Sequence, residues 1–357
     1  MSLNPPLRPV TVLSAGGTIA MAGARARPAL GVDALVAAVP ALADVADLRT
    51  RSIVELPGAH IGAADALAIA RAALEEAAAG RGVVITHGTD TMEEAAVLCD
   101  VLHAGEEPIV LTGAIRPSGA PGADGPANLL DAVAAAGAHE TAGLGALVCF
   151  AGELHAARAV RKVSSTSPAA FGSPLGGPLG YVAERSVRIA ARPRRPQALG
   201  LPPAIEGRVP IVPTYLGDRG ESLIAALRDG ADAIVFVALG AGHVAPPVLE
   251  ALRSAAARAP VAVTLRPERG LLLRDTYGFE GAEGDLRASG ALAAGALSPQ
   301  AARMILLAGL GAGRGASRSQ PRSEAESLVH RESKTRQPWA PSGHGGLIRA
   351  AENVRER

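Results

Sequence analysis

Short runs of β-branched residues alternate with longer segments rich in alanine and leucine through the first half of this chain. This alternation constrains the fold more than any other feature. The predicted strands are Val10–Leu13, Val83–Thr86, Ile109–Thr112 and Ala146–Phe150. Between them, apolar residues recur at helical spacing over residues 64–79 and 92–104. Strands that alternate with helices in this way predict a mostly parallel sheet covered by helices.

A change in composition near residue 200 predicts two domains. Residues 191–207 are rich in proline and arginine, which favour neither helix nor strand, so we expect a linker there. Residues 1–190 then form a larger N-terminal catalytic α/β domain, and residues 208–311 a smaller C-terminal α/β domain. Its predicted strands and helices are Val209–Pro213, Glu221–Arg228, Ala233–Leu239, Val248–Ala257, Pro260–Leu265 and Pro299–Ala308.

The last part of the chain, residues 312–357, is predicted to be disordered. It is rich in glycine, serine, arginine and glutamate, and too few of its residues are apolar to offset the entropy cost of ordering them. This tail carries nine Lys/Arg and five Asp/Glu, whereas the rest of the chain carries 26 and 29 and is mildly acidic. A solvated tail is favoured over a nucleic-acid-binding one on this charge pattern.

Composition excludes several classes of function. Aromatic residues make up only 2% of the chain, so platforms on which nucleic-acid bases stack are scarce, and we expect no nucleic-acid partner. The two cysteines, Cys99 and Cys149, both lie in apolar surroundings, which favours a reducing compartment. We find no metal-binding motif, no signal peptide and no membrane-spanning stretch, so the expectation is a cytoplasmic protein without metal or cofactor.

Two predicted strands end in segments that combine glycine with threonine hydroxyls. These segments are residues 16–20, Gly-Gly-Thr-Ile-Ala, and residues 87–94, His-Gly-Thr-Asp-Thr-Met-Glu-Glu. Ligands of open parallel sheets bind outside the carboxyl ends of the strands. A threonine hydroxyl attacks a carbonyl only with a positioned base and with donors for the developing oxyanion. Free backbone N–H groups at Gly16 and Gly17, and the start of the helix after Asp90, are suitable donors.

Each segment also has a purely structural interpretation. Gly-Gly-Thr is typical of a tight turn or a phosphate-cradling turn. Thr91 with Glu94, or Asp90 with Glu93, fits a capping box at the start of the following helix. Capping does not account for the preceding His-Gly-Thr, however.

Residues Ser14–Ala20 and Ile85–Glu94 closely resemble the two signature segments of the bacterial-type L-asparaginases, a family of threonine amidohydrolases. The resemblance extends over roughly residues 8–308. Further stretches agree with that family in order and spacing: Leu111–Pro117, Ala123–Leu129 and Gly177–Tyr181.

The resemblance implies a role for four side chains. Thr18 is the implied nucleophile, Thr89 and Lys162 the implied proton-handling pair, and Asp90 the implied partner of the substrate α-ammonium. Catalysis would be a two-step hydrolysis of L-asparagine through an acyl-enzyme. The implied substrate-binding residues are Gly17, Gly58, Ala59, His60, Gly88, Thr89, Asp90, Ala114, His243 and Glu280. Judged without the family, Lys162 with Arg158 and Arg161 is typical of a solvated basic surface.

The chain departs from the family pattern in three places. Family members often carry a tyrosine in the lid after the first motif, but Met21–Leu30 has none. Pro57-Gly58-Ala59-His60 replaces the usual serine and glutamine, which leaves the backbone N–H groups of Gly58 and Ala59 to bind the substrate carboxylate.

The third departure concerns the neighbouring subunit. The family completes its site with an asparagine and a glutamate of that subunit, which implies a homodimer or homotetramer with a shared site. Here His243 occupies the asparagine position, and Glu280 or Glu283 is the candidate acid.

Two other functions stay open at this stage. Within the same fold, the chain fits a glutaminase-asparaginase or an amidotransferase-type amidase, although the latter is expected to carry an additional N-terminal domain. From another class, a nucleotide-binding or sensor module would use the glycine turns for phosphate. Neither Gly-x-Gly-x-x-Gly nor Gly-x-x-x-x-Gly-Lys-Ser/Thr follows a predicted strand, which disfavours that module.

Overall fold

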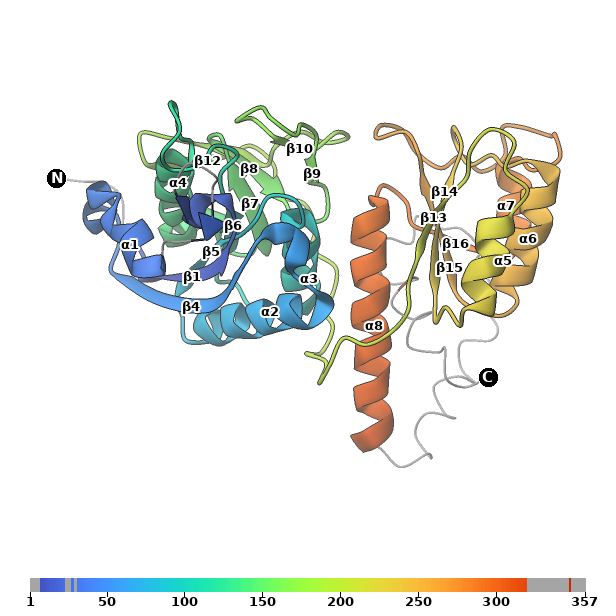
Figure 1. Cartoon of the computed structure of the whole chain (residues 1–357), viewed down its shortest axis with the longest axis horizontal. Helices are drawn as coiled ribbons and strands as arrows, with labels where there is room; N and C mark the ends of the chain where they lie inside the picture. The colour runs from blue at the N-terminus through green and yellow to red at the C-terminus, as the bar shows by residue number, and fades with distance from the viewer. Residues whose placement is uncertain (1–6, 23–26, 29–30, 320–346, 348–357) are drawn as a thin grey trace. The chain divides into compact units, whose positions relative to one another are not determined.

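The computed structural model describes residues 7–22, 27–28, 31–319 and 347. It divides into two compact units at Leu199/Gly200 (Figure 1). Part of the Met21–Leu30 segment, where the sequence lacks the lid tyrosine, lies outside the described residues. Within the described part of the chain, no helix combines the length and hydropathy needed to cross a bilayer.

The first unit is built on an eight-stranded sheet of order β12-β11-β8-β7-β6-β5-β1-β4. Strands β4, β1, β5, β6 and β7 run parallel, whereas β8, β11 and β12 are joined by antiparallel pairing. The strands are β1 (Val10–Gly16), β4 (Leu48–Leu56), β5 (Gly82–Thr86), β6 (Ile109–Thr112), β7 (Ala146–Phe150), β8 (Glu153–Ala156), β11 (Gly180–Ala183) and β12 (Ser186–Ile189). The mostly parallel sheet predicted from the sequence is confirmed.

Helices cover both faces of this sheet (Figure 1). They are α1 (Val32–Ala37), α2 (Ala63–Ala78), α3 (Met92–Leu102) and α4 (Gly125–Gly137). Val12 and Val84 point to the face where they share a core with Leu35 of α1 and Leu129 of α4. Alternate strand residues such as Leu13 face the other way and are equally buried, because α2 and α3 pack there.

Several short elements decorate the first unit. Among the residues of this unit that the structure describes, 3-10 helices lie at Thr18–Ala20, Pro40–Asp44, Gly58–His60 and His139–Thr141. Four short strands form two small sheets: β2 (Met21–Ala22) with β3 (Arg27–Pro28), and β9 (Arg161–Lys162) with β10 (Phe171–Gly172).

The segment after β12 has neither helix nor strand, as its proline and arginine content predicts. Its first part is nonetheless tied to the first unit. Arg195 donates to the carbonyls of His103 and Gly105, and the Leu199 N–H donates to the carbonyl of Val101.

The second unit has a four-stranded parallel sheet of order β13-β14-β15-β16. Helices α5, α6 and α7 lie on one side of this sheet and α8 on the other (Figure 1). The elements are β13 (Ile211–Pro213), α5 (Glu221–Arg228), β14 (Ile234–Ala238), α6 (Pro246–Ala256), β15 (Val261–Leu265), α7 (Glu283–Ala288), β16 (Leu292–Ala293) and α8 (Pro299–Ser319). The predicted smaller α/β domain is therefore confirmed as a fold.

Helix α8 is longer than the sequence predicts. It continues past Ala308 to Ser319, so residues 312–319 are helical where we expected disorder. Leu307 and Leu310 are buried, and Gly311 packs so closely on the Ala204 carbonyl that a Cβ there would lie 2.6 Å from the oxygen. Tertiary packing thus holds the helix as far as Gly311, beyond its predicted end at Ala308. The rest of the predicted disordered tail, apart from residue 347, lies outside the described residues.

Candidate active site

Three loops meet in backbone contact at the carboxyl edge of the first sheet. They follow β1, β4 and β5, which are neighbouring parallel strands. A Cβ on Gly17 would lie 2.4 Å from the Gly88 nitrogen, and a Cβ on Gly88 would lie 2.4 Å from Gly58 Cα. Gly17 also has φ +85°, which L side chains rarely adopt. Only glycines permit this approach, which brings the backbones preceding Thr18 and Thr89 together.

Lys162 completes a cluster with the second of these loops. Its Nζ donates to Thr89 Oγ1 at 2.8 Å and to Asp90 Oδ1 at 2.7 Å. The Lys162 side chain is 19% exposed and that of Asp90 64% exposed. The solvated-surface interpretation of Lys162 is therefore wrong, because its ammonium is directed at a hydroxyl and a carboxylate. A lysine held beside a hydroxyl is an arrangement that can move a proton.

Thr91 does not cap helix α3. It occupies the N-cap position, but its side chain makes no capping hydrogen bond. Its hydroxyl donates instead to the Gly58 carbonyl at 2.8 Å. The capping interpretation of Thr91 is thus wrong, and the residue ties the loop after β4 to the loop after β5.

The loop after β6, which contains Ala114, is held by two side chains near the start of α4. Asp124 accepts the N–H groups of Ile115 at 2.9 Å and of Arg116 at 2.8 Å. Asn128 Nδ2 donates to the Gly113 carbonyl at 3.0 Å. The sequence flagged Asp124 and Asn128 only as part of a similar segment. Their spacing, with a Gly-Pro pair after the aspartate, is the signal that marks them as loop anchors.

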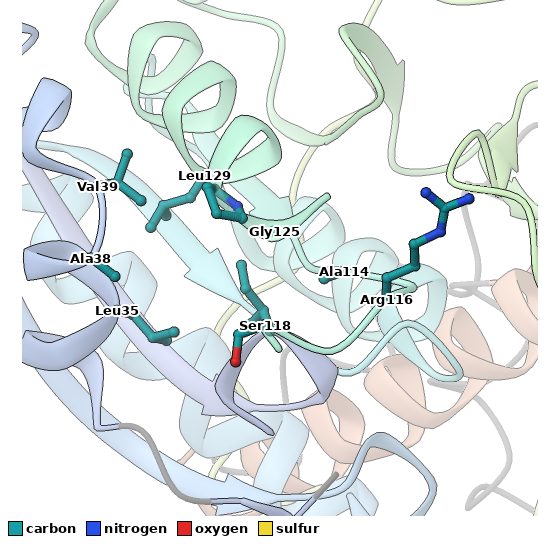
Figure 2. Close-up of a pocket in the computed structure, with 10 residues that line it drawn as sticks. Leu35, Ala38, Val39, Ala114, Arg116, Ser118, Gly125 and Leu129 are labelled. Atoms are coloured by element: carbon teal, nitrogen blue, oxygen red, sulfur yellow. The ribbon is translucent and has the colours of Figure 1, made fainter. Parts of the chain in front are cut away.

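An apolar pocket lies behind this edge (Figure 2). Ile19, the neighbour of Thr18, and Ala114 both line it, so the loop after β1 and the loop after β6 both contribute to the pocket wall. The other lining residues are Leu35, Ala38, Val39, Arg116, Ser118, Gly125, Pro126 and Leu129. In Figure 2 the Arg116 guanidinium points away from the pocket. An apolar lining fits packing and not the charged groups of an amino acid.

His87 lies beneath the threonine loop. Its ring is fully buried, and Nδ1 is 2.8 Å from the Gly88 carbonyl. Burial lowers the pKa of His87, although the hydrogen bond to Gly88 works in the other direction. The ring is therefore neutral near pH 7 and supports the Gly88 backbone.

The remaining predicted site residues of the first unit, Gly58, Ala59 and His60, have no direct contact with the Lys162 cluster. Gly58 is buried at the start of its 3-10 helix, whereas Ala59 and His60 are exposed. Their contacts do not join them to the Lys162 cluster directly. The link runs through Gly58, which packs on Gly88.

His243, Glu280 and Glu283 belong to the second unit. Glu283 is fully buried and lies 3.5 Å from His243 Nε2, whereas Glu280 is exposed. The His243 ring packs edge-on against Tyr277 and Phe279, with centroids 4.9 and 5.1 Å away. Glu283, and not Glu280, is the acid beside His243.

The charge of Glu283 is favoured by its surroundings. Burial alone raises the pKa of a carboxyl group, but backbone N–H donors, among them Tyr277 and Thr276, and the nearby His243 ring together hold the pKa of Glu283 below its usual value. Glu283 therefore presents a carboxylate to His243 at neutral pH. Among the residues described, no group of three or more His, Cys, Asp or Glu is arranged to hold a metal ion.

Family models match both parts of the chain. The model described as "Asparaginase, N-terminal" matches residues 9–195, and the one described as "Glutaminase/Asparaginase C-terminal domain" matches residues 208–320. The chain belongs to the asparaginase family. It is therefore an amidohydrolase, as its resemblance to the family implied.

Individual relatives agree with the family. The chain is 35% identical to "Probable L-asparaginase periplasmic" of Haemophilus influenzae, over 83% of this chain and 87% of the relative. It is 33% identical to "L-asparaginase 2" of Escherichia coli over the same shares. It is 34% identical to "Glutaminase-asparaginase" of Pseudomonas fluorescens, over 68% and 71%. Among solved structures, the probable cytoplasmic L-asparaginase of Campylobacter jejuni matches with a TM-score of 0.76 at 29% identity, over 90% and 98%.

Proposed function

We propose that this protein hydrolyses L-asparagine to L-aspartate and ammonia, with Thr18 as the nucleophile. The observation that carries the proposal is the Lys162 ammonium bonded to both Thr89 and Asp90 at the sheet edge where β1 delivers Thr18. The names of the relatives at 33–38% identity support asparagine as substrate.

The proposed reaction has two steps. Thr18 Oγ1 attacks the side-chain amide carbon, its proton passes to the Thr89–Lys162 pair, and backbone N–H groups stabilise the negative oxygen of the tetrahedral intermediate. The Thr89–Lys162 pair delivers a proton to the amide nitrogen, which leaves as ammonia. Water then attacks the ester on Thr18, and aspartate is released with the proton returned to the threonine.

Substrate binding follows from the same edge. Asp90 is proposed to bind the α-ammonium, because its carboxylate is exposed beside Lys162. The backbones of Thr89 and Ala114 are proposed to line the amide pocket, with Gly17 and Gly88 also in contact with the substrate. The N–H groups of Gly58 and Ala59, with His60 nearby, are proposed to bind the α-carboxylate in place of the missing serine.

A second copy of the chain is proposed to complete the site. In the smaller unit, buried Glu283 pairs with half-buried His243, whose ring packs against the exposed Tyr277 and Phe279. His243 and Glu283 are proposed to face the substrate bound by the neighbouring subunit of a homodimer or homotetramer. A cytoplasmic location is likewise proposed; the name of the similar Campylobacter jejuni structure supports it, whereas the name of the Haemophilus influenzae relative points to the periplasm.

Glutamine is the alternative substrate, because the relatives include glutaminase-asparaginases. The two substrates differ by one methylene, so the substrate choice depends on how far the α-carboxylate loop at Gly58–His60 lies from Thr18. Asparagine is favoured because the relatives named L-asparaginase include those that match the larger shares of this chain, from 72% to 84%.

Ammonia release from asparagine and glutamine by the purified protein, beside its Thr18→Ala variant, tests the proposal. Release by the wild type that vanishes in the variant supports it. Equal release by both proteins removes Thr18 from the chemistry. Tight nucleotide binding with no ammonia from either amide instead supports the nucleotide-binding alternative.

A further inference from the structure

The segment that carries Lys162 is held on the first unit by buried Val160 and by the ion pair of Arg158 with Asp100 of α3, but its own strand is short. Strand β9 is only two residues long and pairs solely with β10 in a two-stranded sheet separate from the large one. In that pairing Lys162 lies opposite Phe171. A pair of such short strands cannot fix a long lysine side chain to within a fraction of an ångström.

The side chain of Glu93 holds the main chain of Lys162 itself beside the candidate active site. The Lys162 backbone N–H donates to Glu93 Oε2 at 2.9 Å, across 69 positions of sequence. Glu93 lies in the first turn of α3, directly after the loop that presents Thr89 and Asp90. The lysine is thus held at its main chain by the same helix end whose loop holds its ammonium.

Helix α3 is a rigid platform for this contact. Nine of its eleven residues are buried, among them Met92, Ala95 and Ala96 on either side of Glu93 along the chain. A carboxylate in the first turn is also favoured by the helix dipole. The position of Glu93, and with it that of the Lys162 main chain, is therefore set by the core of the first unit.

We propose that Glu93 is a positioning residue for the hydrolysis, acting through Lys162 and not on the substrate. By accepting the Lys162 backbone N–H, Glu93 fixes the distance between the Lys162 main chain and the start of α3. At that distance Nζ reaches both Thr89 Oγ1 and Asp90 Oδ1. This inference rests on the proposed role of the Thr89–Lys162 pair. Misplacement of a reacting group by about 1 Å costs on the order of 100-fold in rate.

Three variants test the inference. Glu93→Ala removes the acceptor, and Glu93→Gln keeps an oxygen that accepts the same N–H. Asp232→Ala is the matched control, because Asp232 also accepts a backbone N–H, that of Arg208 at 2.8 Å, but in the second unit. We expect Glu93→Ala to lower kcat by about 10- to 100-fold with little change in KM, Glu93→Gln to restore most of that loss, and Asp232→Ala to keep the wild-type kcat.

Each outcome decides one point. A wild-type kcat in Glu93→Ala overturns the positioning role. An equal loss of kcat in Glu93→Gln also overturns it, because that variant keeps the oxygen that accepts the Lys162 N–H. If Glu93→Ala does not fold, Glu93→Met, of similar length but without an acceptor, takes its place against Glu93→Gln.

A crystal structure separates this inference from the proposed function. In Glu93→Ala we expect Lys162 Nζ to leave hydrogen-bond distance of Thr89 Oγ1, whichever amide the enzyme hydrolyses. An unmoved Lys162 overturns the inference. Absence of ammonia release by the wild type contradicts the proposed function alone.

Discussion

Lys162 is the residue on which the candidate chemistry depends most. A lysine ammonium is a compact charge on a flexible stem. A hydroxyl and a carboxylate that both accept its hydrogen bonds therefore fix the position of the ammonium and the direction of its N–H groups. Thr89 and Asp90 supply that pair at 2.8 and 2.7 Å.

Lys162→Met is expected to lower amide hydrolysis by about 100- to 10,000-fold, the usual contribution of a positioned acid or base. The methionine keeps much of the apolar stem, so the fold should persist. Ammonia release and a thermal melt of both proteins measure the two effects. Unchanged turnover would remove Lys162 from the mechanism.

His155 gives stability a pH dependence. Its ring is fully buried, with Nδ1 3.1 Å from Ser173 Oγ, and burial lowers its pKa to about 4. Between the unfolded value of 6.5 and about 4, the unfolded chain binds a proton that the folded chain does not, so stability falls as pH falls through that window. Above this window the group contributes no slope.

His155→Gln should therefore flatten the pH dependence. The slope of the unfolding free energy between the two pKa values is expected to decrease by up to about 1.4 kcal/mol per pH unit. Urea unfolding of the wild type and the variant at several values from pH 7 down to pH 5 measures this slope. Parallel curves for the two proteins would show that His155 titrates normally.

The resemblance to the family, and not the residue types alone, nominated Thr89, Asp90 and Lys162, whose side chains the structure brings together. Contacts between distant segments were not predictable. Glu93 and Thr91 both looked like helix caps, because a capping box depends on local spacing alone. Their actual partners lie 69 and 33 positions away.

At the scale of elements, the loops after β1, β4 and β5 form a stack of glycines. The Gly88 position is the middle of the stack, where an added Cβ meets the backbone of Gly58. A backbone neighbour cannot rotate aside as a flexible side chain does, so the stack tolerates no side chain.

Gly88→Ala is expected to lower the unfolding free energy by about 1–3 kcal/mol, as overpacking does, and to reduce ammonia release. Gly176→Ala is the matched control, because a Cβ there meets nothing within 4 Å. Chemical denaturation and the ammonia assay measure both variants. Equal stability of the two variants would mean that the loops are not packed as described.

Strand prediction succeeded where β-branched residues are buried and failed where they are not. The strands β5, β6 and β7 read as apolar runs because helices cover both of their faces. Strand β4 was missed because it lies at the sheet edge and exposes charged residues such as Arg49 and Arg51. The end of helix α8 was predicted too early, at Ala308, because composition alone does not show which residues are buried against other parts of the second unit.

At the scale of the whole molecule, the two units have separate apolar cores. One includes Val12 and Leu129 of the first sheet and its helices, and the other includes Phe236 and Leu252 of the second. The change in composition near residue 200 made the two-domain α/β architecture predictable.

A shared site makes a distinctive prediction for mixed subunits. Thr18→Ala and Glu283→Gln should each be nearly inactive, since each spoils every site. Equal amounts of the two variants, unfolded and refolded together, should give about half mixed pairs, and each symmetric mixed pair contains one intact site of its two. About a quarter of the wild-type activity should therefore return. The ammonia assay measures this recovery.

A mixture of Thr18→Ala with Lys162→Met is the control. Both of these residues lie in the first unit. If each site combines the first unit of one subunit with the second unit of the other, every site in this mixture contains a first unit with one of the two substitutions, and none is intact. Recovery in the first mixture and none in the control supports the shared site. No recovery in either mixture would contradict it.

A crystal structure of Lys162→Met soaked with L-asparagine tests the central claim most directly. The account predicts the substrate amide carbon in contact with, or bonded to, Thr18 Oγ1, with the α-ammonium at Asp90. Asparagine bound away from the edge formed by the loops after β1 and β5, or with its amide turned away from Thr18, would contradict it.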